Sequence, residues 1–117
     1  MISSLELATE YAQRLFTLGD VSAVRFFGGA ALRLDGVQFG MVMEDVLYFR
    51  VDDASRDAFL AAGSGPFIYR GSARDVRVAT WLSVPPGILG QSETLRVWAV
   101  AAHRAAIAAA AAKKKRR

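Results

Sequence analysis

Residues 24–51 consist of short apolar runs separated by turn residues, and this pattern restricts the fold more than any other part of the chain. The turn residues are Gly28-Gly29, Asp35-Gly36 and Glu44-Asp45. Asp-Gly is favoured in two-residue hairpin turns because both of its residues accept a positive φ. The pattern therefore predicts a meander of three to four antiparallel strands. The apolar runs cover residues 24–27, 31–34, 37–43 and 46–51.

A helix is expected at each end of the chain. Ser3 and Glu6 have capping-box spacing ahead of an amphipathic pattern that Gly19 ends. Near the other end, Ser92 is the expected N-cap of an alanine-rich helix that is free to extend into the C-terminal tail. Its apolar stripe consists of Leu95, Trp98, Ala102 and Ala105.

A short helix and a second hairpin are expected between these parts. Asp52 or Asp53 is predicted to cap the helix, which ends at Gly63. Residues 67–70 and 76–82 then form the hairpin across residues 71–73, and Pro85-Pro86 ends the sheet. Simple alternation places Val76, Val78 and Leu82 on one face and Arg77, Ala79 and Trp81 on the other.

Length and composition are typical of one globular α+β domain. The chain has 117 residues, 53% of them hydrophobic and 22% charged, which is too apolar for a disordered protein. Residues 1–112 are assigned to the domain and residues 113–117 to a basic tail. No linker separates a second domain, and no internal repeat is present.

The net charge of +4 comes from the tail. Without its five cations, ten arginines face 11 acids, so the body has a net charge of −1. Two interpretations of the tail remain open: it binds nucleic acid through phosphate contacts, or it ends the helix and aids solubility. The tail residues are Lys113, Lys114, Lys115, Arg116 and Arg117.

The residue types that carry catalysis or bind metals are scarce. There is no cysteine, and the single histidine, His103, has no second histidine and no carboxylate at helical spacing to complete a metal site. No serine lies in a Gly-x-Ser-x-Gly elbow, so the sequence gives no support for hydrolase chemistry. The acidic pairs Glu44-Asp45 and Asp52-Asp53 fall at predicted turns and caps, where carboxylates have structural roles. We therefore expect no catalytic residue, no metal site and no cofactor.

The aromatic residues lack interleaved cations, so they are predicted to fill the core rather than to stack on bases. Phe27→Ala and Trp98→Ala are each expected to cost roughly 3–5 kcal/mol. Gly28-Gly29 is expected to form a tight turn or bulge, where glycine accepts a positive φ or allows close approach of another element. These aromatic residues include Phe26, Phe27, Phe39, Phe49, Phe59, Phe67 and Trp98.

The first 20 residues are amphipathic and acidic, unlike a signal peptide, so the cytoplasm is the expected location. The longest apolar run, residues 97–112, is mostly alanine and is interrupted by His103 and Arg104. It is expected to form a soluble helix rather than to span a membrane.

Several ordered blocks resemble one known family. Residues 24–29 and 32–39, followed by residues 45–52 and 59–69, are similar to successive blocks of the N-terminal domain of the TfoX/Sxy competence regulators. The resemblance covers roughly residues 5–110. The family motif residues in this chain, which are expected to be structural, are Arg25, Phe27, Gly28, Gly29, Asp35 and Gly36.

This resemblance implies a two-layer α-β-β-β-α-β-β-α domain with an antiparallel sheet, similar to type III secretion chaperones. It implies a non-enzymatic regulatory or adaptor module that acts on competence gene transcription. A transcription regulator such as the cyclic-AMP receptor protein is the implied partner, and a homodimer is a further expectation. The regulators carry a second, C-terminal domain, whereas this chain is expected to be a stand-alone N-terminal domain.

Overall fold

The predicted capping box begins helix α1 (Ser4–Arg14), in a computed structural model that describes residues 2–71 and 73–115. Ser3 Oγ accepts a hydrogen bond from the Glu6 amide at 3.1 Å, and the Ser3 amide donates to the Glu6 carboxylate at 3.3 Å. A 3-10 turn, η1 (Phe16–Leu18), follows and ends at Gly19, which has a φ of 137°. The chain therefore leaves the helix at the predicted glycine.

Four antiparallel strands come next. Each two-residue turn between them has two positive φ angles: 44° and 81° at Phe27-Gly28, 53° and 77° at Asp35-Gly36, and 50° and 67° at Glu44-Asp45. This left-handed geometry matches the twist of the flanking strands. The strands are β1 (Val21–Phe26), β2 (Gly29–Leu34), β3 (Val37–Met43) and β4 (Val46–Arg50).

The strand count corrects the order that the resemblance implies. That order has three strands before the second helix, whereas the structure has four, the upper value of the range predicted from the sequence pattern. The difference arises at Phe27-Gly28, because this dipeptide makes a complete hairpin turn that separates β1 from β2. The rest of the element order follows the prediction.

Helix α2 (Asp53–Ala61) is capped by Asp52 and followed by β5 (Pro66–Arg70), β6 (Asp75–Ser83), α3 (Pro86–Leu89) and α4 (Ser92–Lys115). The single turn of α3 replaces the irregular turn that was predicted. The predicted cap at Ser92 is wrong by one residue. The Leu95 amide donates to the Gln91 carbonyl at 2.9 Å, so Gln91 occupies the cap position and Ser92 is already helical.

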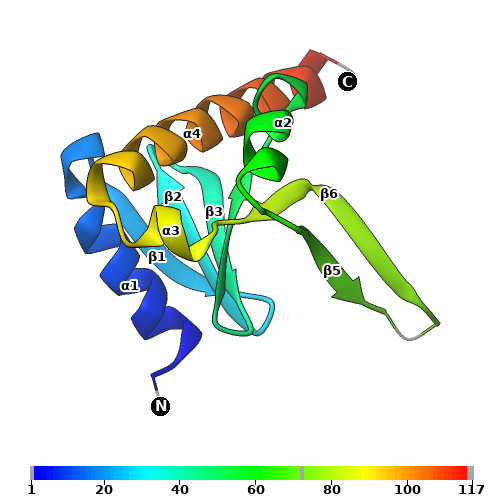
Figure 1. Ribbon diagram of the computed structural model, residues 1–117, viewed down its shortest axis with the longest axis horizontal. Coiled ribbons are helices and arrows are strands. Elements are labelled where there is room, and N and C mark those ends of the chain that lie inside the picture. The colour runs from blue at the N-terminus through cyan, green and yellow to red at the C-terminus, as the bar shows by residue number, and fades with distance from the viewer. Residues whose placement is uncertain (1, 72, 116–117) are drawn as a thin grey trace.

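All six strands form one sheet in the order β1-β2-β3-β4-β6-β5. Helices α1 and α4 pack against it and form the second layer, while the β5–β6 hairpin projects from the body (Figure 1). The core between the layers is completed by α2, whose Phe59 ring lies 4.1 Å from the Trp98 ring of α4, centroid to centroid. Its largest fully buried side chains are Phe39, Phe49, Leu15, Leu32, Leu47, Leu82 and Leu95.

The predicted faces of β6 are wrong. Pro66 pairs with Leu82, but the next residue of β5, Phe67, pairs with Val78. The single step from Pro66 to Phe67 on β5 therefore corresponds to four steps on β6, from Leu82 to Val78. This irregularity interrupts the regular alternation of β6 side chains between the two faces of the sheet. As a result Val78 and Trp81, which were expected on opposite faces, line the same cavity.

Helix α4 is longer than the apolar run suggested. It continues without a break through Lys115, as the alanine-rich sequence allowed. In length and composition it meets the requirements of a membrane-spanning helix, contrary to the expectation from the sequence. Its contacts are those of a core helix, because one stripe packs on β3 and β4. The buried residues of that stripe are Leu95, Ala99, Ala102, Ala105 and Ala106.

Candidate functional site

The β1–β2 turn presents an aromatic side chain at its tip. Phe26 pairs with Gly29 across the hairpin, so Phe27 and Gly28 are the two turn residues. The Phe27 side chain is 86% exposed and packs edge-on against Phe26, with ring centroids 4.8 Å apart. The prediction that Phe27 lies in the core is therefore wrong. A large aromatic residue that is exposed at a positive φ suggests a contact surface.

Gly28 and Gly29 are required for different reasons, both of which the sequence suggested. Gly28 has a φ of 81° with open space around it, so its role is conformational. Gly29 has no positive φ, but a Cβ there would lie 2.2 Å from the Val42 carbonyl oxygen and 2.5 Å from Met43 Sδ. The turn is thus held tightly against β3.

The Phe27 turn forms one wall of a cavity of about 440 Å³ on the sheet face that points away from the helices. Met41 and Met43 form its floor, since they alternate with the core residue Val42. The β5–β6 hairpin forms the opposite wall. We call this surface the aromatic groove. It is lined by Phe26, Phe27, Met41, Met43, Phe67, Tyr69, Val78 and Trp81.

Tyr48 of β4 supports the hairpin side of the groove. Its ring packs edge-on against Phe67, with centroids 5.2 Å apart. Burial raises the pKa of the Tyr48 hydroxyl, and the nearby Glu44 carboxylate adds to this effect. The phenol therefore stays uncharged at neutral pH and acts as an apolar support.

The β5–β6 hairpin adds positive charge beside the groove. Arg70 and Asp75 form an ion pair across its strands. Arg74 and Arg77 are exposed, and among the described residues no carboxylate forms an ion pair with either. Arg77 alternates with the groove residue Val78 and therefore lies on the hairpin face that points away from the groove, whereas Arg74 lies between the two strands. The groove thus has an aromatic, methionine-rich centre.

The family motif residues do not form one site. Arg25, Phe27, Gly28 and Gly29 lie at one end of β2, whereas Asp35-Gly36 forms the turn at its other end. The six residues of β2 separate the two groups by roughly 20 Å. Asp35 and Gly36 therefore serve the second hairpin turn, and the first group shapes the aromatic groove.

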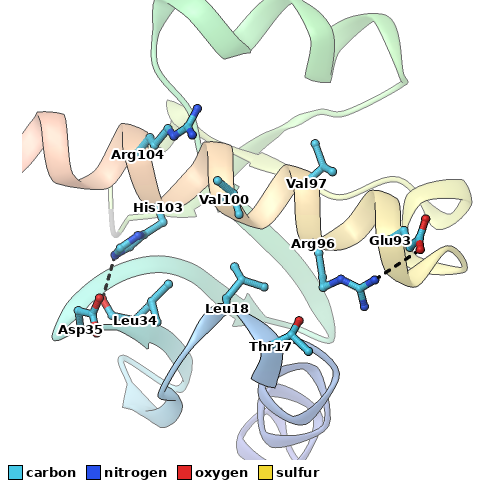
Figure 2. Close-up of a pocket in the computed structure, with 10 residues that line it drawn as sticks. All are labelled: Thr17, Leu18, Leu34, Asp35, Glu93, Arg96, Val97, Val100, His103 and Arg104. Carbon is cyan, nitrogen blue, oxygen red and sulfur yellow. Dashed lines mark hydrogen bonds and ion pairs between the residues drawn. The ribbon is translucent and has the colours of Figure 1, made fainter.

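His103 lies in a second cavity, of about 630 Å³, between α4, η1 and the β2–β3 turn (Figure 2). Its Nε2 is 3.0 Å from the Leu34 carbonyl oxygen, and its ring meets the Phe39 ring edge-on. Glu93 also lines the cavity, but it is ten residues away on α4, about 15 Å along the helix axis, and pairs with Arg96 at 3.9 Å. Asp35 lines the cavity as well, but no carboxylate of the described residues forms a hydrogen bond or ion pair with His103. His103 therefore holds α4 against the sheet through the Leu34 carbonyl oxygen.

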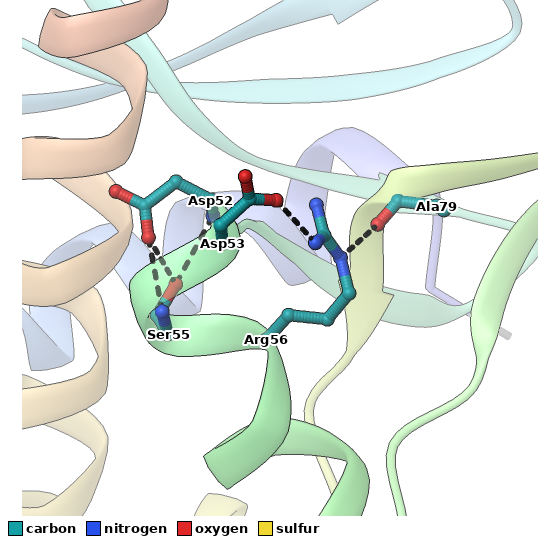
Figure 3. Close-up of polar contacts among 5 residues, drawn as sticks. All are labelled: Asp52, Asp53, Ser55, Arg56 and Ala79. Atoms are coloured by element: carbon teal, nitrogen blue, oxygen red, sulfur yellow. Dashed lines mark hydrogen bonds and ion pairs between the residues drawn. The ribbon is translucent and has the colours of Figure 1, made fainter.

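The acidic pairs occupy the structural positions predicted for them. Asp52 accepts hydrogen bonds from the Ser55 amide and hydroxyl, both at 3.0 Å, and caps α2 (Figure 3). These bonds, that of the amide first, lower the pKa of the Asp52 carboxyl. Asp53 pairs with Arg56 at 2.7 Å. Glu44-Asp45 forms the β3–β4 turn. Within residues 2–71 and 73–115, no three acidic or histidine side chains gather as a metal site.

The basic tail begins as part of α4. Lys113, Lys114 and Lys115 are helical and exposed, so they present positive charge at the C-terminal end of α4. Arg116 and Arg117 lie outside the described residues. The tail is separate from the residues that line the aromatic groove.

The sequence reasoning missed the aromatic groove. The seven aromatic residues named above were expected in the core, which is right for Phe39, Phe49 and Phe59 but wrong for Phe27. Phe26 and Phe67 line the groove instead. One indication was present: Met41 and Met43 alternate with Val42, so a strand with a buried Val42 must place both methionines on the other face.

No curated protein matches the chain at a significant level. The sequence model of the TfoX N-terminal domain family matches residues 13–106, from within α1 to within α4, and so includes the groove and all six strands. The chain belongs to the TfoX N-terminal domain family.

Proposed function

We propose that this domain is a non-enzymatic, cytoplasmic adaptor that binds a protein partner through the aromatic groove and acts in transcription control. The exposed Phe27 at the head of the groove carries the proposal. Soluble domains rarely leave a contiguous apolar surface of this kind uncovered unless it binds something. Membership of the TfoX family supports a regulator of competence genes as the setting.

The composition of the groove favours a protein segment over a nucleic acid. Met41 and Met43 adapt their shape to a partner, and aromatic anchors supply most of the binding energy in protein interfaces. A stacking platform for bases would need interleaved cations, whereas the eight residues that line the groove include none.

The charge beside the groove indicates the kind of segment. Arg74, which lies between the two strands of the hairpin that forms one wall, would attract a carboxylate placed next to an apolar anchor. The occupant we propose is an apolar segment flanked by acidic residues, presented by a transcription regulator such as the cyclic-AMP receptor protein. A second copy of this chain is the competing occupant.

Site-specific cross-linking in host cells tests this proposal. A photoreactive phenylalanine analogue is placed at Phe27, and as a control at Val97, which is 68% exposed on α4. We expect adducts with a transcription regulator or a polymerase subunit at position 27 only, lost on Tyr69→Lys in the groove wall. The same Tyr69→Lys variant should lower the output of a competence-gene reporter.

Other outcomes would contradict the proposal. Equal adducts at positions 27 and 97, or no adduct at 27, would exclude the groove as the binding surface. An adduct between two copies of this chain would replace the transcription regulator with a homodimer.

A second candidate function is nucleic-acid binding by the tail, favoured by the exposed lysines on the last turn of α4. Contacts to phosphates release counterions, so affinity for duplex DNA should fall steeply with salt. Deletion of residues 113–117 should then abolish binding in a low-salt filter assay. Equal retention by the truncated and full-length chains would exclude the tail.

A further inference from the structure

A third cavity, of about 540 Å³, lies beneath the C-terminal half of α4 and shares one lining residue, Trp81, with the aromatic groove. Gln38 of β3 and Arg50 of β4 line it from the sheet, and Trp81 of β6 lines it beside them. Helix α4 contributes the small side chains of Ala106 and Ala109, together with Lys113. We call this space the α4 cavity.

The α4 cavity forms where two strands stop pairing. The β3–β4 ladder ends at Gly40 and Phe49, beyond which β4 pairs only with β6. Gln38 lies before the paired part of β3 and Arg50 after the paired part of β4. Gln38 still pairs with β2 and Arg50 with β6, so both lie where β3 and β4 no longer pair with each other, and the small alanines of α4 leave room there.

Arg50 is a half-buried cation without an ion-pair partner among the described residues. Its guanidinium carbon lies 5.6 Å from the centroid of the Trp81 ring, in a cation–π contact. Its Nε is buried with no hydrogen-bond partner, and no carboxylate among the described residues pairs with it. Burial lowers the pKa of Arg50, the expected result when a charged group loses water without gaining a counterion.

Gln38, which lines the same cavity, also has a buried donor without a hydrogen-bond partner, its Nε2. Buried donors in folded proteins are almost always satisfied, so two orphaned donors on residues that line one cavity require an explanation. Both nitrogen donors lack a hydrogen-bond acceptor.

We propose that the α4 cavity binds a small carboxylic acid with an apolar or aromatic body. The Arg50 guanidinium holds the carboxylate, since its planar fork matches the two oxygens, and Gln38 donates a further hydrogen bond. Lys113 adds positive charge at one side. The body of the ligand packs on Trp81 and on the alanines of α4. An acidic side chain of a protein partner has the same chemistry and is the competing source.

NMR titration of the isotope-labelled full chain tests the site. The probes are acetate, octanoate and phenylacetate, with uncharged phenylacetamide and inorganic phosphate as controls. The readouts are the Arg50 Nε–H and Gln38 side-chain amide signals, assigned by their loss in Arg50→Met and Gln38→Leu. Each probe is added up to about 10 mM, well above the Kd of a millimolar ligand.

We expect saturable shifts of both signals with octanoate or phenylacetate, and binding at least roughly tenfold weaker for phenylacetamide. Arg50→Met and Gln38→Leu should each weaken binding, Arg50→Met by more. Arg74→Met, at an exposed arginine between β5 and β6 that does not line the cavity, should leave binding unchanged. Because Met and Leu fill the space of the original side chains, at least one variant should stay folded.

A second arm distinguishes the two sources of the carboxylate. The probe is the blocked peptide acetyl-Leu-Glu-Leu-amide. Shifts with this peptide alone would overturn the small-molecule assignment in favour of a partner's acidic side chain. The site itself is overturned if no probe gives a saturable shift, if phosphate alone does, or if phenylacetate binds Arg50→Met as well as the unchanged protein.

Discussion

Gly29 lies so close to Val42 that a Cβ at position 29 would be 2.2 Å from the Val42 carbonyl oxygen. The contact fixes the β1–β2 turn against β3 and so sets where Phe27 stands above Met41 and Met43. The groove therefore depends on a backbone approach that only glycine permits.

Gly29→Ala should destabilise the domain by about 1–3 kcal/mol, because the added methyl group meets backbone rather than a movable side chain. Gly65→Ala is the matched control. A Cβ there meets nothing within 4 Å, so its free energy of unfolding should change by less than about 0.5 kcal/mol. Urea unfolding of both variants measures the difference. Equal losses would contradict the close approach.

Truncation of Phe27 and of Phe39 to alanine should lower the free energy of unfolding by very different amounts. Phe39 is fully buried, so Phe39→Ala should cost about 3–5 kcal/mol of unfolding free energy. Phe27→Ala should cost less than about 1 kcal/mol, since it loses only an exposed edge-on contact with Phe26. Denaturant unfolding measures both. A large loss for Phe27→Ala would mean that this side chain is packed rather than presented.

The Asp52 carboxyl should make the free energy of unfolding depend on pH. The Ser55 hydrogen bonds lower its pKa below the ordinary value of 3.8, so the charged form favours the folded state. This contribution is fully present above pH 3.8 and is lost as the pH falls through the lowered pKa. Asp52→Asn still caps α2, so it should keep stability near neutral pH and flatten the decline in acid.

Ser55→Ala provides a graded comparison for Asp52, because it removes the hydroxyl donor and leaves the amide donor. Its acid decline should lie between those of the unchanged protein and Asp52→Asn. Thermal unfolding at a series of pH values follows all three. An unchanged acid decline in Asp52→Asn would assign the effect to other carboxylates.

His103 should matter for stability. His103→Phe keeps a ring beside Phe39 but leaves the Leu34 carbonyl oxygen without its partner, so it should cost about 0.5–1.5 kcal/mol. Arg104→Ala, at the exposed neighbouring residue, should stay within about 0.5 kcal/mol of the unchanged protein. Urea unfolding compares the two. No loss in His103→Phe would show that the hydrogen bond contributes nothing.

Local signals determined most of the secondary structure. The Ser3–Glu6 capping box, the Asp35-Gly36 turn and the Asp52 cap each act within a few residues, so each could be recognised from sequence alone. The same reasoning failed at Ser92, because Gln91 can occupy a cap position that no sequence preference assigns to it.

The two candidate sites depend on contacts between distant residues. The groove needs the irregular pairing that brings Val78 and Trp81 to one face, and the α4 cavity needs Gln38 and Arg50 beyond the end of their shared ladder. Neither strand register can be predicted from a local sequence pattern.

The sequence by itself determined the elements, their order apart from one strand, and the family, since periodicity, caps and turn dipeptides act locally. Only the tertiary structure decided which apolar side chains lie outside the core. An apolar residue enters the core only if its strand register points it there, and register is set by pairing with distant strands. For this reason Phe39 of β3 is buried. Phe27 is exposed above the aromatic groove because the pairing of β1 with β2 makes it a turn residue.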